Sequence, residues 1–222
     1  MGRAGGHAGT ALGRLSVAVD RDTTLAWMTS FAASMEEHRE ELVQLDTAIG
    51  DGDHGTNMNR GMQKAVAQLA AAEQADTGAV LKTVAMALIS TVGGAAGPLY
   101  GTLFLQLGTV LAGLQEVDLP SYAAAWRRAL EGVQARGKAQ AQDKTMVDAL
   151  IPAVAALEAA TDLEDGIRAA AEAAHQGALA TTPLVARKGR ASYLGERSAG
   201  HQDPGATSTY YLFKSAAETF AH

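Results

Sequence analysis

The sequence predicts an all-α protein, a bundle or barrel of eight helices in succession. Apolar residues recur at intervals of three and four along most of the chain, which is the period of a helix with one buried face. Alanine is abundant and aromatic residues make up only 5% of the chain, a balance that suits packed helices better than β-sheets. Hydrophobic residues are 47% of 222, enough to fill a core, and no shift in composition marks a second domain.

The predicted helices follow a glycine-rich start. Residues 1 to about 20 lack periodicity and are expected to form a disordered arm, which leaves 21–222 as a single domain. The first helix places Leu25, Phe31 and Leu42 on one face, with Asp22 or Thr23 as its cap. The other seven are predicted at about 58–69, 76–90, from 98 onward, 121–137, 145–157, 163–180 and 203–220.

Several predicted helix ends rest on single residues. Pro98 suits a first helical turn and Gly137 a C-terminal position. Thr145 with Asp148 resembles a capping box. The stretch 182–202 has no clear period, and loops of that length are usually functional or disordered.

Charge and composition exclude several classes of protein. A formal net charge of -6 argues against a nucleic-acid partner, which needs a basic surface. The absence of cysteine excludes disulfide scaffolds and thiol catalysis. No apolar run reaches the ~18 residues of a membrane span and no signal peptide is evident, so we expect a cytoplasmic protein. One basic cluster is either a solvated surface or an anion site: Arg187, Lys188, Arg190 and Arg197.

The loop from Asp46 to Gly55 concentrates acids and glycines between two helices. Its carboxylates, Asp46, Asp51 and Asp53, repel one another unless a cation or solvent separates them. Hard cations such as magnesium prefer carboxylate and water oxygens, and glycines allow the backbone to turn the acids toward a common point. The loop therefore predicts a site where divalent metal ions bridge carboxylates and nucleotide phosphates.

Other interpretations of the glycine motifs fit less well. A hydrated turn in which Asp51 and Asp53 cap the next helix is the plain alternative. A calcium loop fails because Met62 stands where a glutamate is required, and the G-x-G-x-x-G string at 50–55 follows a helix instead of a strand. The Walker A-like string at 132–138 also follows a helix and is followed by Ala139 instead of Ser or Thr.

Three helix starts are candidates for phosphate binding, because free N–H groups and the helix dipole favour an anion there. They are His54 to Asn57, the break Gly93 to Gly97, and Asp203 to Gly205. His54 is alternatively a capping or core histidine, and the glycine break a tight turn. Arg190 has the planar fork that pairs with phosphate oxygens. No nucleophile–base arrangement is evident, so no catalytic residue is predicted.

Four segments together resemble the L subunit of dihydroxyacetone kinase: LDTAIGDGDHGTNMNRG, GGAAGPLYGT, RGKAQAQDKTMVDA and ARKGRASYLGERSAGHQDPGATS. The resemblance implies an eight-helix antiparallel up-and-down barrel with the nucleotide site in the loops at one end. It implies that the magnesium ligands are Asp46, Asp51 and Asp53. It also implies nucleotide contacts from His54, Gly55, Thr56, Asn57, Ala95, Ala96, Gly137, Met146, Arg190, Asp203, Pro204 and Gly205. Family members often carry a hydroxyl residue where this chain has Ala96, which puts a side-chain hydrogen bond to phosphate in doubt.

The resemblance also implies how the chain would act. It would hold ADP or ATP with two magnesium ions and carry phosphate from an M subunit of the phosphotransferase system to dihydroxyacetone, which a K subunit binds on its own histidine. The chain's length, with no K region, favours this separate-subunit branch. The same fold using free ATP, on dihydroxyacetone or on another short ketose such as erythrulose, is an open alternative. A regulatory or adaptor module without turnover is another.

Overall fold

The computed structural model describes residues 19–220, and in this part of the chain the structure is mainly helical. Two short strands, β1 (Val19–Asp20) and β2 (Glu116–Val117), pair antiparallel. The 3-10 helix η1 covers Arg190–Ser198. The α-helices are α1 (Arg21–Glu37), α2 (Arg39–Ile49), α3 (His54–Ala71), α4 (Thr77–Thr91), α5 (Ala96–Val110), α6 (Leu119–Gly137), α7 (Val147–Ala159), α8 (Leu163–Ala180) and α9 (Pro204–Phe220).

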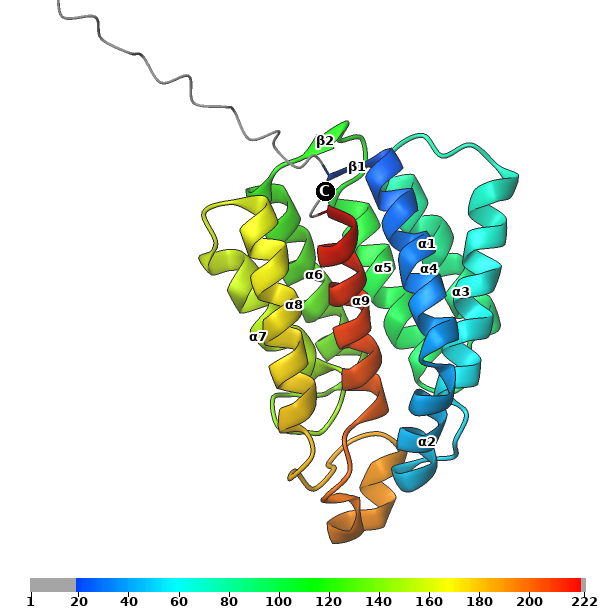
Figure 1. The fold of residues 1–222 in the computed structure, drawn as a ribbon, viewed down its shortest axis with the longest axis vertical. Coiled ribbons are helices and arrows are strands. Elements are labelled where there is room, and N and C mark those ends of the chain that lie inside the picture. The colour runs from blue at the N-terminus through cyan, green and yellow to red at the C-terminus, as the bar shows by residue number, and fades with distance from the viewer. Residues whose placement is uncertain (1–18, 221–222) are drawn as a thin grey trace, which may run out of the picture.

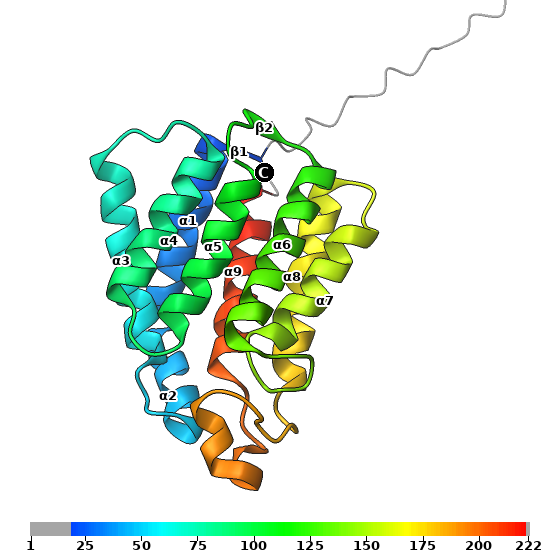
Figure 2. The same cartoon turned by 180° about the vertical axis from the view of Figure 1, so that it is seen from behind.

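Eight of these helices form a closed ring. From α3 to α9 each helix packs against the next along the chain, α9 packs against α1, and α1 packs against α3. Neighbouring helices run in opposite directions, and α2 extends from the lower end of α1 in Figures 1 and 2. The predicted all-α, up-and-down architecture is confirmed.

The predicted first helix is two helices, so the described residues contain nine α-helices, eight of which form the ring. The chain breaks at His38, which lies between α1 and α2 with φ -93° and ψ 12°. The His38 ring stacks on Tyr211 of α9 at a centroid distance of 4.0 Å, and its Nδ1 lies 2.9 Å from a carboxylate oxygen of Glu41. Because the stacking on Tyr211 is a tertiary contact and no Gly or Pro marks the site, periodicity alone could not reveal the break.

Aromatic side chains fill the middle of the ring. The ring of Trp126 on α6 lies 6.2 Å from that of Trp27 on α1 and 4.2 Å from that of Phe213 on α9. Trp27 also donates its Nε1–H to the carbonyl of Leu212, at 3.1 Å. All three rings are buried, so one continuous core joins helices that are distant in sequence.

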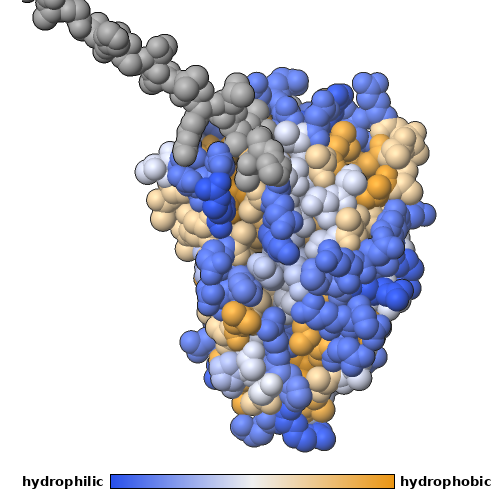
Figure 3. Space-filling view, viewed as in Figure 1, coloured by the Kyte–Doolittle hydropathy of each residue, from blue (hydrophilic) through white to orange (hydrophobic). Residues whose placement is uncertain are grey.

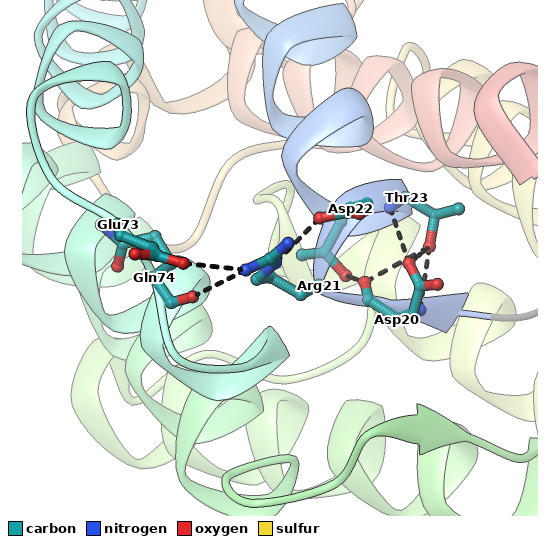
Figure 4. A network of polar contacts seen from close by, with 7 residues as sticks. Asp20, Arg21, Asp22, Thr23, Glu73 and Gln74 are labelled. Atoms are coloured by element: carbon teal, nitrogen blue, oxygen red, sulfur yellow. Dashed lines mark hydrogen bonds and ion pairs between the residues drawn. The ribbon is translucent and has the colours of Figure 1, made fainter.

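The start of α1 is held by Asp20, as Figure 4 shows. The backbone N–H of Thr23 donates to the Asp20 carboxylate, and the backbone N–H of Asp20 donates to the Thr23 hydroxyl, both at 2.8 Å. The cap is therefore Asp20, two or three residues before the predicted Asp22 or Thr23, because Thr23 serves as the N3 partner of a capping box. Arg21 reaches the Gln74 carbonyl at 3.5 Å and so ties α1 to the α3–α4 connection.

Val19 and Asp20 therefore belong to the folded part, although the sequence places them in the predicted N-terminal arm. Val19 is buried and pairs with Val117 of β2. Residues 1–18, the rest of the predicted arm, lie outside the described residues.

The up-and-down order gathers four connections at one end of the ring. These are residues 50–53, 92–95, 138–146 and 181–203, and they include every loop in which the sequence predicts site residues. The helices α3, α5, α7 and α9 all begin at this end. Their N-terminal N–H groups therefore concentrate positive potential there.

The surface gives two further observations. The face in Figure 3 is largely hydrophilic, with hydrophobic patches at its upper right and near the end that carries α2 and η1. Among the described residues, none of the helices combines the length and apolar character that crossing a membrane requires.

Candidate functional site

A cavity of about 480 Å³ lies among the four connections at this end. It is lined by the three predicted metal ligands and by most of the predicted nucleotide contacts. The predicted residues that do not line it are Gly55, Thr56, Asn57 and Gly137. The segments that the sequence singles out thus meet at one place, although they extend along the chain from Asp46 to Gly205.

The three acidic residues of the predicted metal site converge. Carboxylate oxygens of Asp46, Asp51 and Asp53 all lie within 4.8 Å of one another. Asp46 is buried on the last turn of α2, and its Oδ2 accepts the backbone N–H groups of Asp53 (2.8 Å) and His54 (3.1 Å). Asp51 and Asp53 are exposed. Asp46 is therefore fixed by the backbone, while the other two carboxylates face solvent.

Two glycines make this turn possible. A Cβ built on Gly50 would lie 2.0 Å from Oδ1 of Asp46, so any side chain at this position displaces the carboxylate. Gly52 has a φ of +73°, a left-handed conformation that glycine adopts without steric cost. The glycines predicted to orient the acids are thus required at these two positions by sterics and by backbone conformation.

The acidic cluster suits a hard divalent cation. Every donor in it is a carboxylate oxygen, the ligand type that magnesium prefers. Trans ligands of one magnesium ion lie about 4.2 Å apart, given bonds of 2.0–2.1 Å, so the observed spacing needs only small side-chain movements. The residues present therefore fit magnesium.

His54, the first residue of α3, begins a chain of hydrogen bonds that leads from the cavity into the core. Its Nε2 lies 2.8 Å from the Ser208 hydroxyl of α9, which lies 2.7 Å from the Tyr100 hydroxyl of α5. Burial lowers the pKa of His54, although Asp46 and Asp53 oppose this shift. Burial also raises the pKa of Tyr100 to about 12, so its hydroxyl stays protonated. This network fixes the His54 ring at the cavity wall and joins three helices beneath it.

The next three residues of α3 do not line the cavity. Gly55 is buried against α2, where a Cβ would lie 2.1 Å from the carbonyl of Arg39. Asn57 is buried and accepts a hydrogen bond from Arg60 at 2.6 Å, whereas Thr56 is exposed. Of the four residues predicted at this helix start, only His54 lines the cavity.

The Gly93 to Ala96 segment lines the cavity at the start of α5. Gly94 has a φ of +65°, and the N-cap residue, Ala95, offers no side-chain acceptor to the first-turn N–H groups. Ala96 is the first residue of α5 and is partly buried. Its side chain carries no hydroxyl, so its backbone N–H is the only hydrogen-bond donor at this position.

Asp203 caps the last helix at the floor of the cavity. It is buried, and its Oδ2 accepts the backbone N–H of Ala206 at 2.7 Å. Burial raises the pKa of Asp203 to about 7, and the nearby carboxylates of Asp148 and Asp46 add to this shift. The adjoining Gly205 faces Met146, because a Cβ on Gly205 would lie 3.6 Å from that of Met146. Met146 is buried at the start of α7, so α7 and α9 meet at this wall.

The basic cluster is only partly at the site. Arg190 and Lys188 line the cavity, whereas Arg187 and Arg197 do not. Arg190 Nη2 lies 2.9 Å from Asp51 Oδ2, which links the 182–202 segment to the acidic turn. The 3-10 helix η1 occupies the middle of that segment, with a kink at Gly195 (φ 56°). The predicted aperiodic loop therefore contains an unpredicted helix that carries Arg190.

Several cavity residues lacked a signal in the sequence. Leu99 and Tyr100 read as core positions of a helix, and Tyr193 as an ordinary loop residue that is in fact 86% exposed at η1. Lys144 is the least expected, because a lysine is rarely buried and this one is 1% exposed.

Gly137 is the last residue of α6 and packs near Leu99. The residue with a left-handed backbone at this helix end is the next one, Lys138, with a φ of 48°.

Comparisons with known proteins identify the family. A family model described as the DAK2 domain matches residues 48–218. The chain belongs to the DAK2 domain family. This DAK2 chain is 42% identical over 205 residues to the PEP-dependent dihydroxyacetone kinase, ADP-binding subunit DhaL of Escherichia coli (strain K12), which covers 90% of this chain and 98% of that protein. It is 44% identical over 200 residues to the PEP-dependent dihydroxyacetone kinase 1, ADP-binding subunit DhaL of Listeria innocua, with coverage of 90% and 97%.

A solved structure shares the fold of this DAK2 chain. The crystal structure of the dihydroxyacetone kinase from C. freundii in complex with AMP-PNP and Mg2+ matches with a TM-score of 0.69 and 23% identity. The match covers 98% of this chain and 37% of that one, so this chain spans little more than a third of the solved structure. At this identity the likeness shows the fold alone.

Proposed function

We propose that this chain is the nucleotide-bearing subunit of a phosphoenolpyruvate-dependent dihydroxyacetone kinase. It holds ADP or ATP with two magnesium ions, and it carries a phosphoryl group from an M subunit to dihydroxyacetone bound on a K subunit. The observation that carries this proposal is the convergence of three carboxylates on one cavity at which four helices begin. The relatives named as ADP-binding subunits match over 97–98% of their own length, which supports the separate-subunit form.

Each group at the cavity has a task in this proposal. Asp46, Asp51 and Asp53 hold magnesium, which when bound supplies positive charge to the phosphates. The backbone N–H groups at the start of α5 bind phosphate oxygens, and His54 contacts the nucleotide from the start of α3. Arg190 pairs with phosphate through its planar fork, and Met146 contacts the base. Because phosphoryl transfer needs mainly positioning and charge neutralisation, this chain needs no nucleophile of its own.

The exposed aromatic side chain beside the cavity supports the need for a partner. Tyr193 lies on η1, three residues from Arg190, and is 86% exposed. Exposed aromatic residues next to a functional cavity are typical anchors of protein interfaces. In this proposal η1 faces the subunit that presents the ketose.

The decisive experiment on the site is Asp51→Asn, which removes one ligand charge from an exposed position. We expect weaker magnesium-dependent ADP binding by isothermal titration calorimetry and unchanged helicity by circular dichroism. Asp22→Asn, an exposed acid at the opposite end of the ring, is the matched control and should leave ADP binding unchanged. Equal ADP affinity in the wild-type and Asp51→Asn proteins would refute the metal assignment.

Reconstitution tests the reaction itself. The chain is mixed with a K subunit, an M subunit and its phosphotransferase-system proteins, and triose phosphate is measured with phosphoenolpyruvate or with ATP as donor. We expect product from phosphoenolpyruvate at catalytic amounts of ADP. Triose phosphate formed from ATP alone would show that ATP, and not phosphoenolpyruvate, is the donor. No product from either donor would favour a module without turnover.

A further inference from the structure

A buried lysine lies beneath the segment that carries Arg190. Lys144 is 1% exposed, and within residues 19–220 its ammonium group forms no ion pair. It donates instead to backbone carbonyls: those of Thr181 at 2.8 Å, Thr182 at 3.4 Å and Leu184 at 3.1 Å, and that of His201. Burying a charge is costly unless hydrogen bonds replace its hydration, and these carbonyls do so.

The carbonyls come from both ends of one segment. Thr181 is the C-cap residue of α8, where the helix dipole is negative and favours a cation. His201 lies at the other end of the segment, two residues before Asp203. The ammonium group therefore closes the base of the 182–202 segment, whose middle is η1. Burial lowers the pKa of Lys144, while the nearby carboxylate of Asp203 opposes this shift.

The backbone at Lys144 is in an unfavourable conformation for a side-chain-bearing residue. Its φ is +62°, and Lys138 and Gln142 in the same connection also have positive φ. Glycine would adopt this conformation more easily, so a lysine here indicates a use for the side chain. Such clusters of left-handed residues are typical of functional sites.

We propose that Lys144 is a positioning residue, whose ammonium group joins the two ends of the 182–202 segment and thereby holds Arg190 and Asp203 at the cavity. The last step, from a held segment to nucleotide binding, rests on the proposed function. The first step does not, because it concerns only the contacts of Lys144 with carbonyls of this chain. The two steps can therefore be tested separately.

The absence of cysteine from the chain allows a test of the charge alone. Lys144→Cys places a single thiol at this position. Alkylation of the unfolded protein with 2-bromoethylamine, followed by refolding, restores an ammonium group at nearly the length of lysine. Alkylation with 1-bromopropane gives a neutral side chain of the same length. The wild-type protein treated with either reagent is the control.

We expect the neutral propyl protein to exchange the backbone amides of residues 182–202 faster than wild type, as measured by hydrogen–deuterium exchange. Its affinity for Mg-ADP should fall about 10- to 100-fold, the usual loss when a residue that orients site groups is removed. The aminoethyl protein should regain both the slow exchange and the affinity. Rescue by the charged chain and not by the neutral one separates charge from packing.

Three outcomes would overturn or divide the proposal. Equal amide exchange of residues 182–202 in the propyl and aminoethyl proteins would show that the charge does not hold this segment in place. Fast exchange with unchanged Mg-ADP affinity would show that the segment needs no anchor to serve the site. If wild type bound no Mg-ADP, the proposed function would fail, while the exchange data would still decide whether Lys144 holds the segment.

A second variant serves if the cysteine protein does not refold. Lys144→Gly removes the side chain and suits the left-handed backbone. Propylammonium chloride should then slow the amide exchange of 182–202, because the small cation can occupy the carbonyl cluster, whereas sodium chloride at the same concentration should not. No effect of propylammonium would overturn the proposal.

Discussion

Arg190 and Asp51 form an ion pair, with 2.9 Å between Nη2 and Oδ2, that joins η1 to the acidic turn. Their side chains are 60% and 41% exposed, so solvent screens the pair and little stability depends on it. A contact of this kind is easily exchanged for a ligand. Both residues are thus free to take the roles in phosphate and magnesium binding that we propose for them.

Arg190→Lys should weaken ADP binding in the presence of magnesium by about tenfold, because lysine keeps the charge but loses the planar fork. The free energy of unfolding should stay within about 0.5 kcal/mol of wild type, as for most surface changes. Calorimetric titration and urea denaturation measure these two quantities. Arg197→Lys, on the same 3-10 helix but outside the cavity, is the control. Equal losses in the two variants would argue against a specific phosphate contact.

Gly50→Ala should lower magnesium affinity by about tenfold or more while the helices remain folded. The new Cβ would lie 2.0 Å from Oδ1 of Asp46, so the carboxylate must rotate or the turn must move. Manganese binding followed by electron paramagnetic resonance gives the affinity directly. Gly132→Ala on α6 is the matched control, since its Cβ first meets the flexible side chain of Gln106. A wild-type metal affinity in Gly50→Ala would contradict the geometry described for the turn.

Asp203 should make stability fall as pH rises from about 4 to about 7 in the protein free of nucleotide and magnesium. Its folded pKa of about 7 lies above the ordinary value of 3.8, so the folded state holds a proton that the unfolded chain has lost. The contribution is present in full below pH 3.8 and is lost as pH rises through about 7, with a slope of at most about 1.4 kcal/mol per pH unit.

The Asp203→Asn protein should lack this pH-dependent contribution to stability, while its amide oxygen can still accept the Ala206 N–H. Urea denaturation of both proteins between about pH 5 and about pH 8 measures the difference, with Asp22→Asn as the control for loss of one carboxylate. Parallel stability curves for wild type and Asp203→Asn would mean that the carboxyl group titrates normally.

Ser208→Ala should lower the free energy of unfolding by about 1–3 kcal/mol, because it removes a hydrogen-bonding partner from the part-buried ring of His54 and from the buried hydroxyl of Tyr100. Ser215→Ala is the control. Ser215 is buried on the same helix, but its hydroxyl donates to the Tyr211 carbonyl one turn away, so the loss should be smaller. Urea denaturation compares the two variants, and a larger loss in Ser215→Ala would count against the network.

The sequence predicted the helical architecture because helix periodicity and turn residues are local properties. The break at His38 and the 3-10 helix η1 were missed, since the first depends on stacking against Tyr211 and the second follows no apolar period. The acidic turn was predictable from its density of aspartates and glycines. Lys144 was not, because its burial is set by carbonyls of a distant segment, and a single lysine carries no signal of burial.

The packing of α9 against α1 closes the ring, and it also constrains the order in which the protein can fold. Trp27 and Leu212 are 185 residues apart in sequence, and His54 and Ser208 are 154 apart, so these contacts form only when the last helix arrives. The chain must lose conformational entropy to close these long loops before such long-range contacts can stabilise the fold. The acidic turn comes from the first quarter of the chain and Asp203 from the last tenth. The cavity therefore exists only in the fully closed ring, and nucleotide binding would serve as a signal that folding is finished.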